Sequence, residues 1–308
     1  MLPTSSTSSV TMARSANDLS HDFSIEHLVW FIEGGHSQRG LPSTFFMHLG
    51  LMKTGPTQEP TLRADRSIDS ALVTVVLALF VAAAFGLNEL PGGAAEWVPK
   101  EWKGVHDCAK GLILPLLALR LGLSLHGEEG ADHGLRNRIW VAMGLCWIGD
   151  IALTFSGDTA FLVGLVSFLL GHVMFIVTFR YLVKSGWGTA RGWVQAVATG
   201  VLTVEAVTVV TRLWSPAGEL APAIALYAGV ITLMALLSWS MKTGPGVWAL
   251  RLGATAFVAS DMILAFGKFG GEPIAHGHFW VMGTYILAQW ALTIGFTEVA
   301  LHRAATRP

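Results

Sequence analysis

Charged side chains are scarce in this sequence. Asp, Glu, Lys and Arg together make up 13% of the 308 residues, whereas a soluble globular protein usually carries about 25%. Hydrophobic residues account for 52% of the chain, and the formal net charge is −1. The missing charge indicates a surface that faces lipid, so the lipid bilayer is the first expected partner. Without a basic excess, no nucleic acid partner is expected.

Other absences limit which folds and which chemical functions the chain can have. The two cysteines, Cys108 and Cys146, lie in apolar segments, and each is interpreted as a buried free thiol; a disulfide between them is the alternative. No strand-type alternation of polar and apolar residues is sustained, which argues against a β-barrel. His276 and His278 do not share a helix face, so they form a poor zinc site. We expect no metal and no other cofactor.

Long apolar segments dominate the chain from Asp69 onward. They are about 18–25 residues long, which suits helices that cross a bilayer. The predicted spans are 69–90, 105–125, 139–156, 159–183, 191–212, 221–240, 247–267 and 277–301. The expected fold class is therefore all-α, a polytopic transmembrane helical bundle of about eight spans that occupies residues 69–308.

Residues 1–68 differ from the rest, because they are rich in Ser, Thr, Gly and Pro. A segment of this composition buries little apolar area, so we expect a poorly ordered N-terminal tail. The alternative for residues 23–35 is a short amphipathic helix lying on the membrane surface. The tail has no apolar run long enough for the core of a signal peptide.

Basic residues gather on one side of the predicted membrane. With the N-terminus in the cytoplasm, the inner side carries Arg63, Arg66, Arg136, Arg138, Lys184, Arg191, Lys242, Arg251, Arg303 and Arg307. The outer side carries Lys100, Lys103, Arg212 and Lys268. Because positively charged loops tend to remain in the cytoplasm, both termini are expected there. In a bacterium the protein would lie in the inner membrane.

Two aspartates fall inside predicted spans, where a charge is costly unless it is paired or hydrated. Asp150 lies in GLCWIGDIALTF and Asp261 in GATAFVASDMILAF. Each is about 12 residues, or about 18 Å, from the inner end of its span. Other polar residues within the spans are Lys110, His172, Glu205, Tyr285 and Gln289. We expect one polar cavity, although a purely structural hydrogen-bond network is the alternative and is favoured for Glu205.

The two aspartate segments resemble each other. Aligned on the aspartate, a small residue precedes it, Leu follows at +3 and Phe at +5; the pairs are Gly149 and Ser260, Leu153 and Leu264, Phe155 and Phe266. The segments are four spans apart and so point the same way through the membrane. This predicts two parallel four-helix halves, with chance similarity among apolar segments as the alternative.

Three motifs resemble the lysoplasmalogenase family, the YhhN-type membrane proteins of bacteria and animals. GLCWIGDIALTF and FLVGLVSFLLGHVMFIVTF resemble the family's Gly-Asp span and the Gly, Phe and His helix after it. GATAFVASDMILAFGKF resembles its Ser-Asp segment, and TYILAQWAL its Tyr-x-x-x-Gln pattern. The residues placed in this way are Asp150, Gly164, Phe168, His172, Ser260, Asp261, Tyr285 and Gln289. Lys110 lies in a segment similar to the family's Lys-Pro-Leu, but here Gly111 replaces the proline.

The resemblance implies hydrolysis of the vinyl ether bond of lysoplasmalogen, a lysophospholipid substrate. The products would be a fatty aldehyde and glycerophosphocholine or glycerophosphoethanolamine. A vinyl ether breaks when its β-carbon is protonated, so the chemistry needs one protonated carboxylic acid and one ionised carboxylate. Asp150 and Asp261 are the expected catalytic pair, and either can be the acid. The expected supporting residues are Lys110, His172, Ser260, Tyr285 and Gln289.

Three other functions fit parts of the pattern. Intramembrane acids and a parallel repeat also suit a transporter of small solutes or protons. A metal-dependent membrane lipid hydrolase would use His172, His276 and His278 with an aspartate. A purely structural membrane protein is the last alternative, and two central acids argue against it. The sequence leaves the oligomeric state open.

The basic-residue asymmetry and the even number of spans predict both termini on the cytoplasmic side. Reporter domains fused separately to the two ends, one active only in the cytoplasm and one only outside it, measure this directly. Termini on opposite sides of the membrane would contradict the prediction.

Overall fold

The computed structural model describes residues 71–72, 74–76, 78–79, 103–126, 132–190, 192–272 and 274–306, with only the backbone for 103–109. The predicted tail, 1–68, with the alternative helix at 23–35, lies outside the described residues. So do most of the first predicted span, 69–90, and the side chain of Cys108. Cys146 is a buried free thiol, as predicted.

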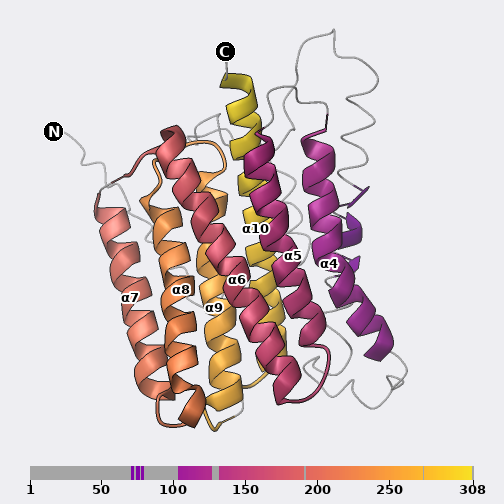
Figure 1. Ribbon diagram of the computed structural model, residues 1–308, viewed down its shortest axis with the longest axis vertical. Helices are drawn as coiled ribbons and strands as arrows, with labels where there is room; N and C mark the ends of the chain where they lie inside the picture. The colour runs from indigo at the N-terminus through magenta and orange to yellow at the C-terminus, as the bar shows by residue number, and fades with distance from the viewer. Residues whose placement is uncertain are drawn as a thin grey trace, which may run out of the picture. The chain divides into compact units, whose positions relative to one another are not determined.

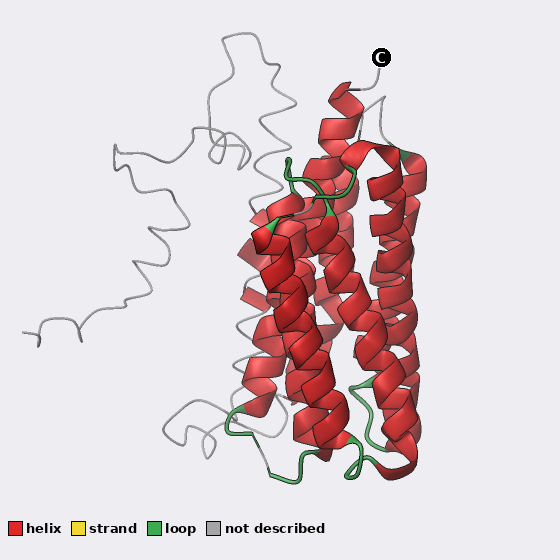
Figure 2. Ribbon diagram, turned by 90° about the vertical axis from the view of Figure 1, so that its left-hand side faces the viewer, coloured by secondary structure: helices red, strands yellow, loops and turns green. Residues whose placement is uncertain are grey.

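The described chain is all-α and consists of helices that run side by side (Figure 1). The helices are α4 Lys103–Ser124, α5 His133–Ala152, α6 Asp158–Leu182, α7 Trp193–Leu213, α8 Ala221–Ser240, α9 Val247–Phe269 and α10 Gly277–Thr306, with the short turns η3 Val183–Trp187 and η4 Gly218–Leu220. Short loops join them at the two ends of the bundle (Figure 2). The predicted spans from 105–125 to 277–301 thus correspond to α4 to α10.

Five described helical segments are long and apolar enough to cross a membrane. They are Asp158–Trp187, Trp193–Leu213, Gly218–Ser240, Val247–Phe269 and Gly277–Thr306. α4 and α5, with 22 and 20 residues, are as long but less apolar. One face of α7 carries valines that are 55–66% exposed: Val197, Val201, Val204 and Val207. A stripe of this kind is unusual on a protein in water and ordinary on one that faces lipid chains.

α5 begins earlier than the predicted span 139–156, and it also ends earlier. Its start is fixed by Asp132, whose Oδ1 accepts a hydrogen bond of 3.0 Å from the N–H of Leu135. An aspartate in this place satisfies an otherwise unpaired backbone donor. After Ala152 the chain leaves the helix through a turn, and Gly157 has φ +114°. Hydropathy alone misses this cap because Asp132 and the residues after it are polar.

The closest helix pairs pack through glycines. A Cβ atom at Gly253 of α9 would lie 2.8 Å from the carbonyl oxygen of Ala288 on α10. Between α5 and α6, a Cβ at Gly149 would lie 2.7 Å from the ring of Phe168, and one at Gly171 would lie 2.8 Å from the Sγ of Cys146. Small residues let helices approach closely where no water drives them together.

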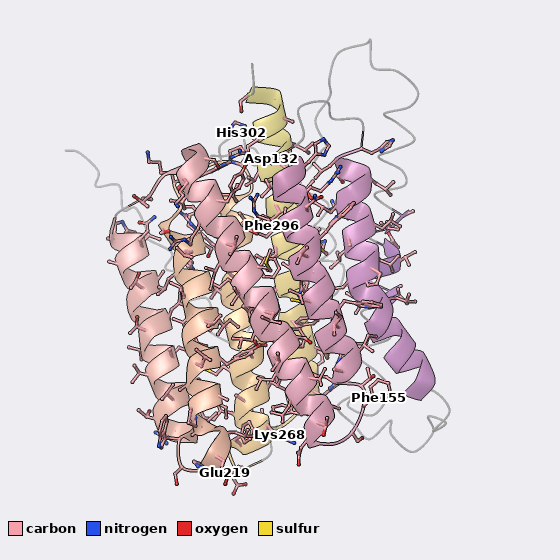
Figure 3. The ribbon with its side chains drawn as sticks, in the orientation of Figure 1. Asp132, Phe155, Glu219, Lys268, Phe296 and His302 are labelled. Carbon is pink, nitrogen blue, oxygen red and sulfur yellow. The ribbon has the colours of Figure 1, made fainter. Side chains whose placement is uncertain are left out.

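The two ends of the bundle carry different polar contacts. Asp132 and His302 lie at one end, and Phe155, Glu219 and Lys268 at the other (Figure 3). Arg303 of α10 pairs with Asp132 at 3.0 Å. The start of α5 and the end of α10, which both carry basic residues predicted for the inner side, therefore meet at the Asp132 end.

Arg251, predicted on the inner side and within the span 247–267, lies near the start of α9. It is 1% exposed, donates a 2.7 Å hydrogen bond to the carbonyl oxygen of Met241 and lies 4.7 Å from the ring centre of Trp248. Its guanidinium caps the chain before α9 and is covered by an aromatic ring.

Gly253→Ala should lower the stability of the bundle by about 1–3 kcal/mol, because the added methyl group meets backbone atoms of α10. Gly200→Ala is the matched control: nothing lies within 4 Å of a Cβ at this position of α7. The measurement is the apparent unfolding temperature in detergent. Equal temperatures for the two variants would show that α9 and α10 are not in close contact at Gly253.

Candidate active site

Asp150 lies on α5 and is 3% exposed. The hydroxyl of Tyr285 on α10 donates a 2.5 Å hydrogen bond to its Oδ2. One turn further along α10, the Nε2 of Gln289 lies 3.3 Å from the same hydroxyl oxygen. Lys110 of α4 is 9% exposed and lies within electrostatic range of Asp150. The structure thus brings four of the predicted site residues together.

Close contact between α4 and α5 brings Lys110 near Asp150. The indole Nε1 of Trp147 donates a 2.7 Å hydrogen bond to the carbonyl oxygen of Gly111. A Cβ atom at Gly111 would lie 3.2 Å from Cδ1 of Ile151. Glycine at this position lets α4 lie against α5 without a side chain between them.

Asp261 lies on α9 and is the less enclosed of the two aspartates. The hydroxyl of Tyr227 on α8 donates a 2.5 Å hydrogen bond to its Oδ2. Nε2 of His172 on α6 lies 4.0 Å from the same oxygen, beyond hydrogen-bond distance. The side chain of Asp261 is 14% exposed, whereas that of His172 is fully enclosed. Both ring nitrogens of His172 lack a hydrogen-bond partner among the described residues.

Aromatic rings fill the space between the two aspartate pairs. The ring of Phe257 lies 5.5 Å from that of Tyr285 and 4.6 Å from that of His172, both edge to face. The ring of Phe168 lies 5.9 Å from that of Tyr285. The tyrosine of one pair and the histidine of the other therefore share one aromatic neighbour.

An apolar groove begins at Asp261 and extends toward the Lys268 end of the bundle. It holds a cavity of about 70 Å³ that is partly open to the surroundings. Its walls come from α5 to α9: Leu153, Phe161, Leu165, Phe168, Glu205, Ala206, Val209, Ile224, Tyr227, Ala228, Ile231, Thr232, Val258, Asp261, Met262, Leu264, Ala265 and Phe269. Asp150 is not among these residues, so only one of the two aspartates faces the groove.

Two residues of the site differ from what the sequence suggested. Ser260 is near Asp261 in the sequence, but its Oγ donates a 3.0 Å hydrogen bond to the carbonyl oxygen of Val281 and so fixes α9 to α10. Tyr227 was not singled out, although it holds Asp261. The chain has three tyrosines, and each donates to an aspartate, the third being Tyr181 to Asp132. The sequence signal that could have identified Tyr227 was a tyrosine within the apolar segment of α8.

The contacts of the two aspartates follow the same order four helices apart. The aspartate on α5 is approached by α4 and α10, through Lys110 and Tyr285. The aspartate on α9 is approached by α8 and α6, through Tyr227 and His172. The helices α4 and α5 of the first set correspond to α8 and α9 of the second set, four places later in the chain. The helix α10 of the first set corresponds to α6 of the second set, four places earlier. Each aspartate thus has one partner on the helices up to α6 and one partner on the helices α7–α10.

The described residues contain no group of three His, Cys, Asp or Glu side chains arranged to hold a metal ion. His172 has one carboxylate beside it, from Asp261. The site geometry is that of two hydrogen-bonded carboxyl groups with a histidine, an amide and an ammonium group around them.

Known proteins resemble this chain over the same helices. The YhhN family model matches residues 105–296. The protein named lysoplasmalogenase from Mycobacterium tuberculosis is 29% identical over 229 residues, which cover 66% of this chain and 84% of that protein. The human lysoplasmalogenase TMEM86A is 25% identical over 220 residues, covering 68% and 82%. No solved structure matches significantly. Since the family match covers more than half of the chain and includes both aspartates, the chain belongs to the YhhN family.

Proposed function

We propose that this protein hydrolyses the vinyl ether bond of lysoplasmalogen. The observation that carries the proposal is the pair of buried aspartates, each held by a tyrosine hydroxyl within one site. Relatives that are named lysoplasmalogenase align over most of their length. The products are a fatty aldehyde and a glycerophospho-base, and no cofactor takes part.

Two carboxyl groups suit this reaction. One donates a proton to the β-carbon of the vinyl ether, which leaves an oxocarbenium ion. The other is an ionised carboxylate that stabilises the positive charge, as one carboxylate does in glycosidases. Lys110 lies on the neighbouring helix α4, where its ammonium group offsets part of the negative charge in the site. His172 and Gln289 line the same interior and position the reacting groups.

The same proposal includes eight membrane spans with both termini in the cytoplasm. α4 and α5 carry more charge than the other helices, but Lys110 and Asp150 lie near each other, which lowers the cost of placing both helices in lipid. The exchanged partners of the two aspartates support two parallel four-helix halves. Residues 1–68 form a tail outside this domain, and 69–308 form the membrane domain.

Asp150→Asn and Asp261→Asn should each fold and each lose activity by about two to four powers of ten. Asparagine keeps the shape and still accepts the tyrosine hydrogen bond, but it neither ionises nor donates an acidic proton. The measurement is fatty aldehyde release from an alkenyl lysophospholipid by purified protein, normalised to monodisperse yield. If the two groups act as a unit, the double variant should be scarcely worse than the worse single variant.

A structural role predicts the reverse pattern, in which yield falls while the activity of each folded molecule is kept. Near-normal specific activity in either variant removes that aspartate from the mechanism. A transporter would release no aldehyde in the purified state, whether the protein is wild-type or variant.

Chelation should leave activity unchanged, because among the described residues the aspartates have no set of ligands with zinc spacing around them. Purified protein is dialysed against a strong chelator and assayed for aldehyde release, with a zinc enzyme treated in parallel to confirm that metal is removed. Loss of activity that added zinc restores would support the metal-dependent alternative instead.

A further inference from the structure

The groove beside Asp261 is only partly enclosed. α6 and α7 both line it, yet among the described helices these two do not pack against each other. In Figure 1, α6 slants away from α7 toward the lower end, and α8 packs against both of these helices. Because these helices are apolar enough to lie in a membrane, a lipid is the class of ligand that such a groove would meet.

A cation marks the mouth of the groove. Nζ of Lys268 lies 5.1 Å from the ring centre of Phe161, and that ring lies 6.0 Å from the ring of Phe269. Both phenylalanines line the groove. Lys268 is 45% exposed and 3.9 Å from Asp158, whose side chain is 95% exposed. An exposed pair of this kind is worth little, so a phosphate can replace Asp158 as the partner of Lys268.

The distance between Lys268 and Asp261 matches one class of molecule, the single-chain glycerophospholipids. Lys268 and Asp261 are seven residues apart on α9, about 10 Å along the helix axis. In a single-chain glycerophospholipid, the glycerol separates the phosphate from the first carbons of the chain by a comparable span. A phosphate at Lys268 therefore brings those carbons to Asp261, with the head group at the membrane surface and the chain deeper.

We propose that the groove binds one single-chain glycerophospholipid from the leaflet at the Lys268 end, with its phosphate on Lys268 and its first chain carbons at Asp261. The orientation of the lipid chain and the role of Asp261 as proton donor rest on the proposed function. Asp150 does not face the groove and is held by Tyr285. It acts as a fixed negative charge that stabilises the oxocarbenium ion across a medium of low dielectric.

Asp261 then serves both proton transfers. Its carboxylic acid gives a proton to the β-carbon, and the ether carbon becomes an oxocarbenium ion. Water adds to that carbon and returns one proton to the Asp261 carboxylate, which gives a hemiacetal. The hemiacetal breaks its C–O bond to the glycerol, with transfer of its hydroxyl proton to the glycerol oxygen. One vinyl ether and one water thus yield one aldehyde and one alcohol, and Asp261 ends protonated, as it began.

Lys268→Gln should raise the KM for an alkenyl glycerophospholipid by about tenfold, the effect of one charge-assisted contact. Its kcat should stay the same, and a 1-alkenylglycerol without phosphate should show no change. Arg212→Gln is the matched control, since Arg212 is an exposed cation at the end of α7 outside the groove. Equal effects of both variants, or an equal effect on both substrates, would overturn the role of Lys268.

Binding is tested without catalysis by an ester-linked lysophosphatidylcholine with a photoactivatable group in its chain. Cross-links should map to α6–α9 and be lost in Ala206→Trp, which fills the groove. Val207→Trp, on a side chain that is 55% exposed, should keep them. Cross-links elsewhere, or equal labelling of both variants, overturn the groove even if vinyl ethers are hydrolysed. Groove cross-links without any hydrolysis support the binding site and reject the proposed function.

Discussion

The cost of a carboxyl group in an apolar bundle governs the arrangement around both aspartates. A buried polar group without a hydrogen bond destabilises the fold, and the loss of water strengthens every interaction that it does make. Tyr285 and Tyr227 meet this requirement at Asp150 and Asp261, each from a helix other than the one that carries the aspartate. The two hydrogen bonds therefore fix how α10 sits against α5 and how α8 sits against α9.

Hydrogen bonds of this length require helices that approach closely, and the glycines provide that approach. Gly149 directly precedes Asp150 and receives the ring of Phe168, and Gly253 lets α9 meet the backbone of α10. The same packing places Phe168 and Phe257 between the two aspartate pairs. The motif residues Gly149 and Phe168 thus act on the chemistry by excluding water and setting distances, while the polar groups carry the charges.

The sequence predicted most of the elements and part of the site. Run lengths of apolar residues place α4 to α10 because each helix must match the membrane thickness. The aspartates stand out because a charge in such a run is costly. Which helices are neighbours depends on packing that a hydropathy pattern does not contain, so Tyr227 was missed and the hydrogen bond from Ser260 to α10 was not predicted. The burial of Arg251 was not predicted, because it depends on Trp248 and on the carbonyl of Met241, which are contacts of the folded chain.

The two aspartates occupy helices four places apart, and the groove distinguishes their surroundings. Each aspartate has one partner on the helices up to α6 and one on α7–α10, so helices in corresponding positions surround the two aspartates. Their partners are not equivalent, since Lys110 lies near Asp150 while His172 lies beside Asp261. The groove reaches Asp261 and leaves Asp150 enclosed. Under the proposed function, the enclosed carboxylate with a cation nearby is suited to stabilise positive charge, whereas the one beside an imidazole and an apolar groove is suited to exchange a proton. A duplicated helix arrangement can thus acquire an acid and a counter-charge from two copies of the same residue, through differences in their neighbours alone.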